Sequence, residues 1–307
     1  MKRTMKYLSV CAIAIAAAGL GFVSCDDDDD LPPIDGFNNS NEVGSANLVA
    51  HWTFDENNNE VISGTASSNT YGTVGSTTGQ LGNALQLTSG ALVYPSIEKI
   101  NTANALNNFT VSMWVNVKGN KDLTAPGFMS FFSLIPVNVS DVWPDITLCA
   151  ETGQYKSTSD TLKLKPLFNT HPAGGGNSLQ DNVAQFNADA AGTSPNAQSG
   201  AFFKGAGKWS HYVAKYDASA GKFYIFANGV SVGGFTIRTP NPGPMIMAVP
   251  VKPVLGSLAA KDIGFTSAPA RGFNVLATAS IDDIRVYNTA LADKDITALF
   301  NLGSAGR

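Results

Sequence analysis

Alternating apolar and polar positions dominate the chain after about residue 47, and this pattern predicts β-strands. One long run is Phe109–Val117, in which every second residue is apolar over nine residues. The residues 84–88 and 91–94 are expected to pair through a turn at Ser89 and Gly90. Further runs predict strands over 48–54, 208–216, 222–228, 230–235 and 277–287.

Two local signals add a hairpin and a helix. Asn228 and Gly229 separate two of the runs, and this dipeptide favours a type I′ turn because both residues tolerate positive φ. One helix is predicted over residues 290–302, where apolar side chains recur at helical spacing, with Asp293 in its first turn and Gly303 past its end.

The composition agrees with a mainly β protein. Apolar residues make up 44% of the 307-residue chain and charged residues only 14%, and the chain holds 30 glycines. A helical bundle would need more Glu, Lys, Ala and Leu, so we expect an extracellular all-β protein with many tight turns. Residues 48–307 are predicted to form a single domain, with a loop-rich insert at about 118–207.

Residues 1–24 are expected to be a lipoprotein signal peptide. A basic start is followed by an uncharged apolar stretch over 7–22, which is short for a membrane span. Small residues before Cys25 resemble the lipobox of bacterial lipoproteins, in which the cysteine is acylated and becomes the mature N-terminus; Phe22 departs from the usual leucine. An ordinary secretory signal with an incidental cysteine is the alternative.

Five aspartates at 26–30 directly follow Cys25. They resemble the acidic export signal that sends lipoproteins of some Gram-negative glycan-foraging bacteria to the outer face of the outer membrane. The resemblance implies a lipid-anchored protein that faces the extracellular side, with residues 25–47 as lipidated cysteine, export run and flexible tether. A solvated acidic tail is the alternative. Cys11 lies in the signal peptide and Cys25 would be acylated, so Cys149 is the one remaining cysteine with a free thiol. It is expected to be buried.

The domain itself is formally neutral. Three of the 20 basic residues lie in the signal peptide and seven of the 24 acidic residues precede Leu48, which leaves 17 of each. No basic field therefore exists to hold nucleic acid, and the balance suits an uncharged ligand.

Five segments, in order, resemble signatures of laminin-G-like domains of the concanavalin A-like jelly roll. This resemblance implies an all-β sandwich of two antiparallel sheets with one short C-terminal helix. The insert matches none of the signatures. The segments are Leu48–Glu56 (LVAHWTFDE), Gly79–Leu87 (GQLGNALQL), Phe109–Val115 (FTVSMWV), Lys208–Val213 (KWSHYV) with Phe223–Gly229 (FYIFANG), and Ser280–Leu291 (SIDDIRVYNTAL).

The resemblance also implies one structural Ca²⁺, because family members often hold calcium with oxygens from the first and last strands. Asp55, Asn57, Asp282 and Asp283 are the candidate ligands. Val61–Gly64 lacks the aspartate that the family carries there, so one expected ligand is missing. The alternative is that Asp55 and Asp282 accept backbone N–H bonds and cap turns.

No catalytic array is found in the sequence. Glucanases of this class carry Glu-x-Asp-x-x-Glu on one strand, and no such pattern occurs. Asp282 and Asp283 are adjacent on a predicted strand and are expected to point to opposite faces. His51, His171 and His211 are too scattered for a zinc motif. We therefore expect a binding protein rather than an enzyme.

Glycan recognition needs aromatic faces for stacking and polar groups for hydroxyls. Trp143 stands in the insert between Asp141 and Asp145 and is a candidate sugar platform, or else a plug over a sheet edge. The further candidate ligand-binding residues are Asp141, Asp145, Tyr155 and His171. Other insert residues of suitable chemistry are Phe168, Asn169, Gln180 and Asn182. The tryptophans expected in the core are Trp52, Trp114 and Trp209.

The expected function is a surface lipoprotein that binds extracellular polysaccharide or glycoprotein glycan and holds it near an outer-membrane uptake complex. Two alternatives belong to other classes. One is a protein-binding adhesion or assembly module of the same fold, and the other is a glycoside hydrolase with carboxylates that converge in a groove.

Acylation of Cys25 predicts that the protein incorporates labelled palmitate when it is expressed in a Gram-negative host. Cys25→Ala should remove the label, because the acylated thiol is lost, whereas Cys149→Ala should keep it. Gel fluorography of labelled cells measures both. Label that persists on Cys25→Ala would contradict the lipoprotein assignment.

Overall fold

The computed structural model describes residues 31–181, 201–232 and 242–307. Residues 33–307 form one compact unit, to which the description below applies. The signal peptide, Cys25 and the aspartate run lie outside the described residues. Among the helices that are described, none has the length and apolar character needed to cross a membrane.

The described residues form fourteen strands, five 3-10 helices and one α-helix. The strands are β1 (Leu48–Trp52), β2 (Asn69–Thr78), β3 (Asn83–Val93), β4 (Phe109–Val117), β5 (Phe128–Pro136), β6 (Ile146–Ala150), β7 (Leu167–Thr170), β8 (Ser178–Asp181), β9 (Ser210–Asp217), β10 (Lys222–Ala227), β11 (Val230–Val232), β12 (Val251–Leu255), β13 (Asn274–Val275) and β14 (Ala277–Tyr287). The helices are η2 (Ser40–Glu42), η3 (Ser45–Asn47), η4 (Glu98–Ile100), η5 (Thr152–Gln154), η7 (Lys261–Ile263) and α1 (Asp293–Ser304).

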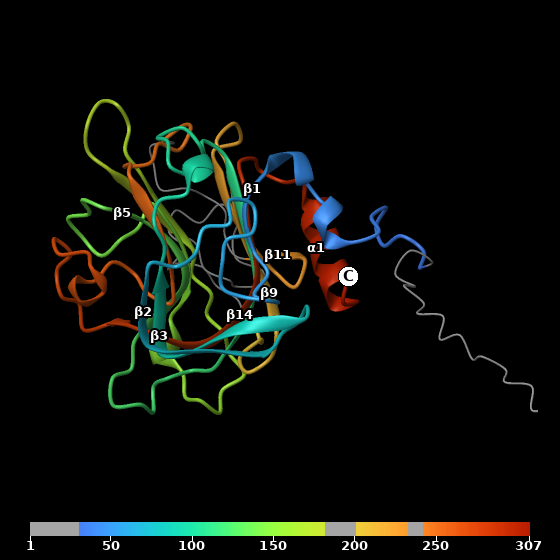
Figure 1. The fold of residues 1–307 in the computed structure, drawn as a ribbon, viewed down its shortest axis with the longest axis horizontal. Helices are drawn as coiled ribbons and strands as arrows, with labels where there is room; N and C mark the ends of the chain where they lie inside the picture. Colours follow the sequence, from blue (N-terminus) through green and yellow to red (C-terminus); the bar gives the residue numbers. More distant parts are fainter. Residues whose placement is uncertain (1–30, 182–200, 233–241) are drawn as a thin grey trace, which may run out of the picture. The chain divides into compact units, whose positions relative to one another are not determined.

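The strands make one continuous sheet that curls into a sandwich. Their order is β11-β10-β9-β4-β14-β3-β12-β5-β6-β7-β8, with β1 on β14, β2 on β3 and β13 on β5. All of these pairings are antiparallel except that of β13. Figure 1 shows β5 across the core from β1, β9 and β11, and one apolar cluster joins side chains of both layers. The all-β jelly roll with one C-terminal helix is therefore confirmed.

Most strands of the signature segments form where the alternation predicts them. The predicted turn at Ser89 and Gly90, however, does not form. β3 runs through Ser89 and Gly90 as one strand, with Ser89 at a φ of 45°. The pairing with β2 shifts register between Tyr71 and Thr73, so the extra residue forms a β-bulge. Gly72 is required there, because a Cβ would lie 1.8 Å from the Ser89 carbonyl oxygen.

The insert holds more regular structure than the sequence suggests. β5 to β8 all lie within residues 118–207 and extend the sheet beyond β12. Every residue of β5 is buried, and its sequence FMSFFSLIP shows no alternation. A strand covered on both faces need not alternate, which is why the pattern missed it.

A bulge in β14 decides which way its acidic residues point. Ile281 and Ile284 both lie in the core cluster, although residues three apart in a regular strand face opposite sides. Asp283 is the extra residue of this bulge and has a φ of 47°. The register with β4 shifts between Asp282 and Arg285. Both aspartates consequently make their contacts on the side away from the core. The expectation that they point to opposite faces is wrong.

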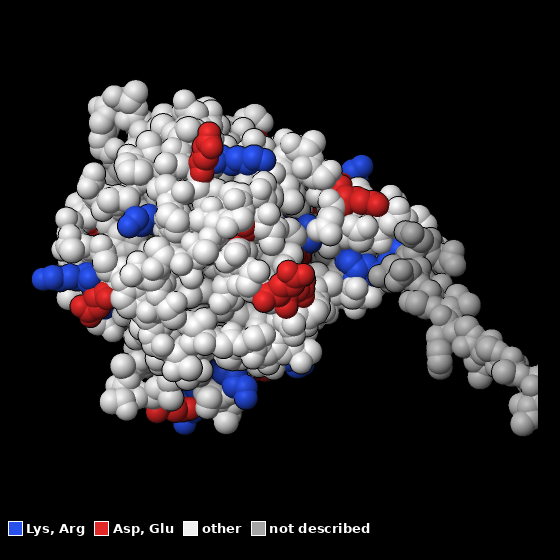
Figure 2. Space-filling view, in the orientation of Figure 1, with Lys and Arg blue, Asp and Glu red and all other residues white. Residues whose placement is uncertain are grey.

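The surface in Figure 2 carries few charged side chains, with both signs interspersed over a mostly uncharged face. This distribution agrees with the formal neutrality of the domain. Cys149 is a free, fully buried cysteine, and burial raises the pKa of its thiol well above the ordinary value.

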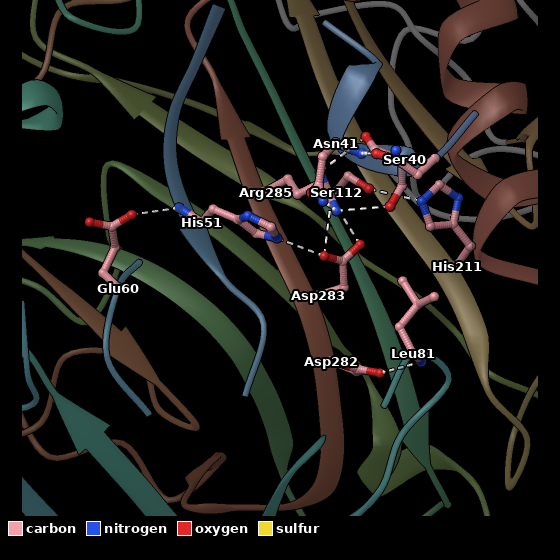
Figure 3. Close-up of polar contacts among 11 residues, drawn as sticks. Ser40, Asn41, His51, Glu60, Leu81, Ser112, His211, Asp282, Asp283 and Arg285 are labelled. Carbon is pink, nitrogen blue, oxygen red and sulfur yellow. Dashed lines mark hydrogen bonds and ion pairs between the residues drawn. The ribbon is translucent and has the colours of Figure 1, made fainter. Parts of the chain in front are cut away.

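The prediction of a flexible tether up to residue 47 is wrong for residues 34–47. Val43 is fully buried beside α1, in a cluster that Ile34 and Phe37 also contact. The guanidinium of Arg285 donates to the Ser40 carbonyl at 3.1 Å and to the Ser40 hydroxyl at 3.0 Å (Figure 3). Three apolar side chains in a polar stretch and one buried cation therefore fix residues 34–47 to the sandwich.

Two tryptophans lie in the core region as expected, whereas the third does not. Trp52 is fully buried, and Trp114 stacks on Phe300 of α1 with ring centroids 5.8 Å apart. Gly303 lies inside α1 rather than past its end, and a Cβ there would lie 2.8 Å from the Trp114 ring. Trp209 is only half-buried and belongs to no apolar cluster among the described residues.

We expect Arg285→Met to lower the free energy of unfolding by about 3–5 kcal/mol. The substitution would leave the buried Asp283 carboxylate without the cation 2.9 Å away and would release Ser40. Denaturant unfolding followed by fluorescence measures the change.

Arg271→Met is the matched control, because Arg271 is 47% exposed and pairs with Asp141 at 3.6 Å. We expect its effect to stay within about 1 kcal/mol. Equal effects of the two substitutions would show that the buried pair does not hold the N-terminal segment.

Candidate functional site

A partly exposed aromatic platform lies on the insert side of the sandwich. Trp143, on the loop between β5 and β6, stacks on Phe273 with ring centroids 5.7 Å apart and ring planes 20° apart. Phe128, the first residue of β5, meets Trp143 edge-on at 6.2 Å. Phe128 packs in an apolar cluster separate from the main core, and Phe273 remains 39% exposed. Phe128 thus supports the stack from the buried side, while Trp143 is partly exposed and Phe273 is exposed.

The first of two cavities beside this platform, here called the aromatic cavity, has a volume of 380 Å³. Its wall includes an ion pair between Glu151 and Lys165 at 2.8 Å, and Lys163 also pairs with Glu151 at 2.6 Å. Its lining residues are Pro126, Gly127, Phe128, Trp143, Glu151, Gly153, Gln154, Lys165 and Phe273.

The second, here called the polar cavity, has a volume of 230 Å³. Trp143 lines it as well, so the indole is the wall that the two cavities share. The lining residues are Pro136, Asn138, Val139, Ser140, Asp141, Trp143, Asn169, His171, Asn177 and Ala248.

A buried carboxyl positions the histidine of the polar cavity. Asp145 is fully buried, and its two oxygens accept from His171 Nε2 at 2.9 Å and from the Ala248 backbone N–H at 2.8 Å. Burial raises the pKa of Asp145 to about 6. Because both oxygens are engaged inside the protein, this carboxyl supports the cavity wall and is poorly placed for acid–base work on a ligand.

The structure brings together most of the ligand-binding residues that the sequence predicts. Trp143, Asp141 and His171 line the polar cavity, and Asp145 stands behind His171. Tyr155 lies apart: it lines neither cavity, and its ring meets Phe202 at 6.5 Å.

Sequence reasoning missed Phe273, which completes the aromatic platform. Phe273 lies 130 residues after Trp143 in a stretch without periodic pattern, so only the chain path brings the two together. An ion pair between Arg271 and Asp141 joins the same two loops at 3.6 Å. A lone aromatic in a loop carries no sequence signal for such a contact.

The predicted calcium ligands are divided between two environments. Asp283 is held by Arg285 at 2.9 Å and by His51 at 2.7 Å. Burial alone would raise the pKa of Asp283, but these two partners outweigh burial and hold it well below its usual range. Asn57 accepts from the Asn59 backbone N–H at 2.7 Å.

Asp55 and Asp282 instead flank the loop 79–83. Asp55 accepts from the Asn83 backbone N–H at 3.0 Å, and Asp282 Oδ2 accepts from the N–H groups of Gln80 and Leu81 at 2.8 and 2.9 Å. Burial raises the pKa of Asp282 to about 7.

Asp282 Oδ1 is buried and has no hydrogen-bond partner, which would suit a cation. Within the described ranges, however, no three acidic, histidine or cysteine side chains gather as a metal-binding group. Asp283 and Asn57 do not fit a shared ion, so calcium stays a prediction that rests on Asp55 and Asp282.

Comparisons with known proteins give one family-model match over part of the chain and a set of structures that share its fold. Residues 173–297 match the sequence model of the concanavalin A-like lectin/glucanases superfamily. No curated protein matches the sequence.

Among solved structures, the binding domain of Paraclostridial mosquitocidal protein 1 is 14% identical over 83% of this chain and 52% of that one, with a TM-score of 0.52. The binding domain of botulinum neurotoxin serotype C1 is 13% identical over 85% and 52%, with a TM-score of 0.51. A structure of botulinum neurotoxin type C, whose cell entry depends upon interaction with two ganglioside molecules, is 13% identical over 84% and 51%, with a TM-score of 0.51. The chain thus spans about half the length of these proteins, and identities this low show the shared fold alone.

A calcium ion between the first and last strands predicts that chelation lowers the midpoint of thermal unfolding, because binding to the folded state stabilises it. Scanning calorimetry with and without EDTA measures the shift. Asp282→Asn should abolish the shift by removing a ligand charge. An unchanged midpoint of the parent protein would leave Asp55 and Asp282 with the backbone N–H bonds that the structure shows.

Proposed function

We propose that this chain, whose residues 173–297 match the sequence model of the concanavalin A-like lectin/glucanases superfamily, binds extracellular carbohydrate at Trp143. The observation that carries the proposal is the partly exposed Trp143–Phe273 stack, with Trp143 lining both an aromatic and a polar cavity. Sugars present both kinds of surface at once, because a ring has apolar C–H faces and a rim of hydroxyls.

The platform suits the C–H face of a sugar. Phe128 supports Trp143 from below, so little conformational entropy is lost when a ligand stacks on the indole. The amides of Asn138 and Asn177 and the imidazole of His171 lie beside it in the polar cavity, within the range of ring hydroxyls.

The fold supports a binding role, since two of the structures reported above are binding domains and a third belongs to a protein whose cell entry depends upon interaction with gangliosides. The carboxyl of Asp145 gives no support to hydrolysis, because His171 and a backbone N–H take both of its oxygens. We therefore favour capture of a glycan over its cleavage.

We further propose that the protein is anchored in the outer membrane through acylated Cys25 and faces the extracellular side, where it serves a glycan uptake complex. Within the domain, residues 34–47 pack beside α1, whereas β5, which supplies Phe128, lies across the sandwich (Figure 1). This arrangement supports presentation of the platform away from the anchored end. Anchoring at high density would make weak single-site binding effective.

We expect Trp143→Ala to weaken glycan binding by at least about tenfold, because the substitution removes the stacking face. Binding is measured on a glycan array and then by calorimetry with the strongest hit. Phe273→Ala should act in the same direction.

Tyr155→Ala is the matched control, an aromatic residue of the same insert that lines neither cavity. It should bind as the parent does, with melting midpoints confirming that all variants are folded. Glycan binding that survives Trp143→Ala would refute the proposed site. An array without hits, together with capture of a defined protein, would favour the adhesion module instead.

A further inference from the structure

We infer that the Trp143 site takes a linear, uncharged oligosaccharide of two or more units, one stacked at the aromatic cavity and the next held in the polar cavity at Asn169. This inference rests on the proposed function and deepens it, because it specifies the ligand class. Three features carry it: the shared wall, an unsatisfied buried amide and the balance of charges.

The two cavities are neighbours that share one lining residue. Trp143 lines both; Phe273 and Phe128 line the aromatic cavity, and Asn169 and His171 line the polar cavity. A single compact ligand would occupy one cavity and leave the other to solvent. A chain of linked units can place one unit in each cavity, with Trp143 between the two units.

Asn169 supplies a hydrogen-bonding group that the protein itself leaves unused. Its neighbour Phe168 lies in the main core, so the alternation of β7 turns Asn169 to the opposite face. Asn169 is only 5% exposed, and its Oδ1 is buried without a partner among the described residues. A buried acceptor without a donor is unfavourable, and a ligand hydroxyl or amide N–H in the polar cavity would satisfy it.

The charged groups of both walls are already paired. Lys165 pairs with Glu151 at 2.8 Å, and Arg271 pairs with Asp141 at 3.6 Å. Asp145 is engaged by His171 at 2.9 Å. An acidic or sulfated sugar would have to displace one of these partners, whereas a neutral sugar meets each pair as a source of donors and acceptors.

The test uses the full chain in detergent on one array of linear oligosaccharides. The array carries glucose, mannose and N-acetylglucosamine chains of one to six units, with uronic and sulfated counterparts. For the parent protein we expect a preference for neutral chains and a gain of at least about tenfold in affinity from one unit to two.

Asn169→Leu should remove this gain from one unit to two, whereas Trp143→Ala should weaken the binding of single units and of longer chains. Because Asn169 is buried, Asn177→Ala is the second variant: Asn177 is exposed on the same cavity, and its truncation should reduce the gain without affecting folding. Melting midpoints verify that each variant is folded.

The outcomes separate this inference from the proposed function. A parent protein that binds single units as tightly as longer chains, or that prefers acidic chains, would overturn the inference while glycan binding stands. A chain-length gain that both asparagine variants retain would do the same. Absence of binding to every probe would overturn the proposed function and this inference with it.

Discussion

The rest of the structure depends on one irregularity in the central strand. β14 pairs with β1, β3 and β4, so its register sets the positions of three other strands. Its sequence places two aspartates between Ile281 and Ile284. In a regular strand these two isoleucines, three residues apart, would face opposite sides of the sheet. The bulge at Asp283 resolves this conflict, and both isoleucines reach the core.

The same bulge creates the buried polar network on the outer side of β14. Asp283, Arg285 and His51 pair there, and Arg285 continues to Ser40 (Figure 3). Burial of a carboxylate is unfavourable by itself, so the ionised form of Asp283 persists because a cation and several donors surround it. Because the pKa of Asp283 is lowered in the folded protein, the ion pair stabilises the fold at pH values above the ordinary pKa of a carboxyl. This stabilisation is lost as the pH falls from that ordinary value to the lowered pKa. The network thereby joins the N-terminal segment to the last strand.

The candidate binding site is built on other strands, β5 to β7, which lie beyond β3 and β12 in the strand order, and it is held together in a different way. There the sheet supplies Phe128 and Asn169, and two loops meet over them through the Trp143–Phe273 stack. The buried carboxyl of Asp145 fixes His171 from behind. The sheet and the two loops, which the Trp143–Phe273 stack and the Arg271–Asp141 ion pair hold together, form a surface that exists before a ligand binds. Such a preformed surface lowers the entropy lost on binding.

The sequence by itself determined the all-β class, the Asn228–Gly229 hairpin and Trp143 as the aromatic of interest, because alternation, turn chemistry and an isolated loop tryptophan are local signals. It did not reveal β5, whose burial on both faces removes alternation, nor the docked residues 34–47. The tertiary structure alone decided that Phe273 meets Trp143 and that Asp282 and Asp283 share one side of the sheet. Such features depend on contacts between segments far apart in the chain and on a bulge that relieves competing demands, and neither is written in the pattern of any single segment.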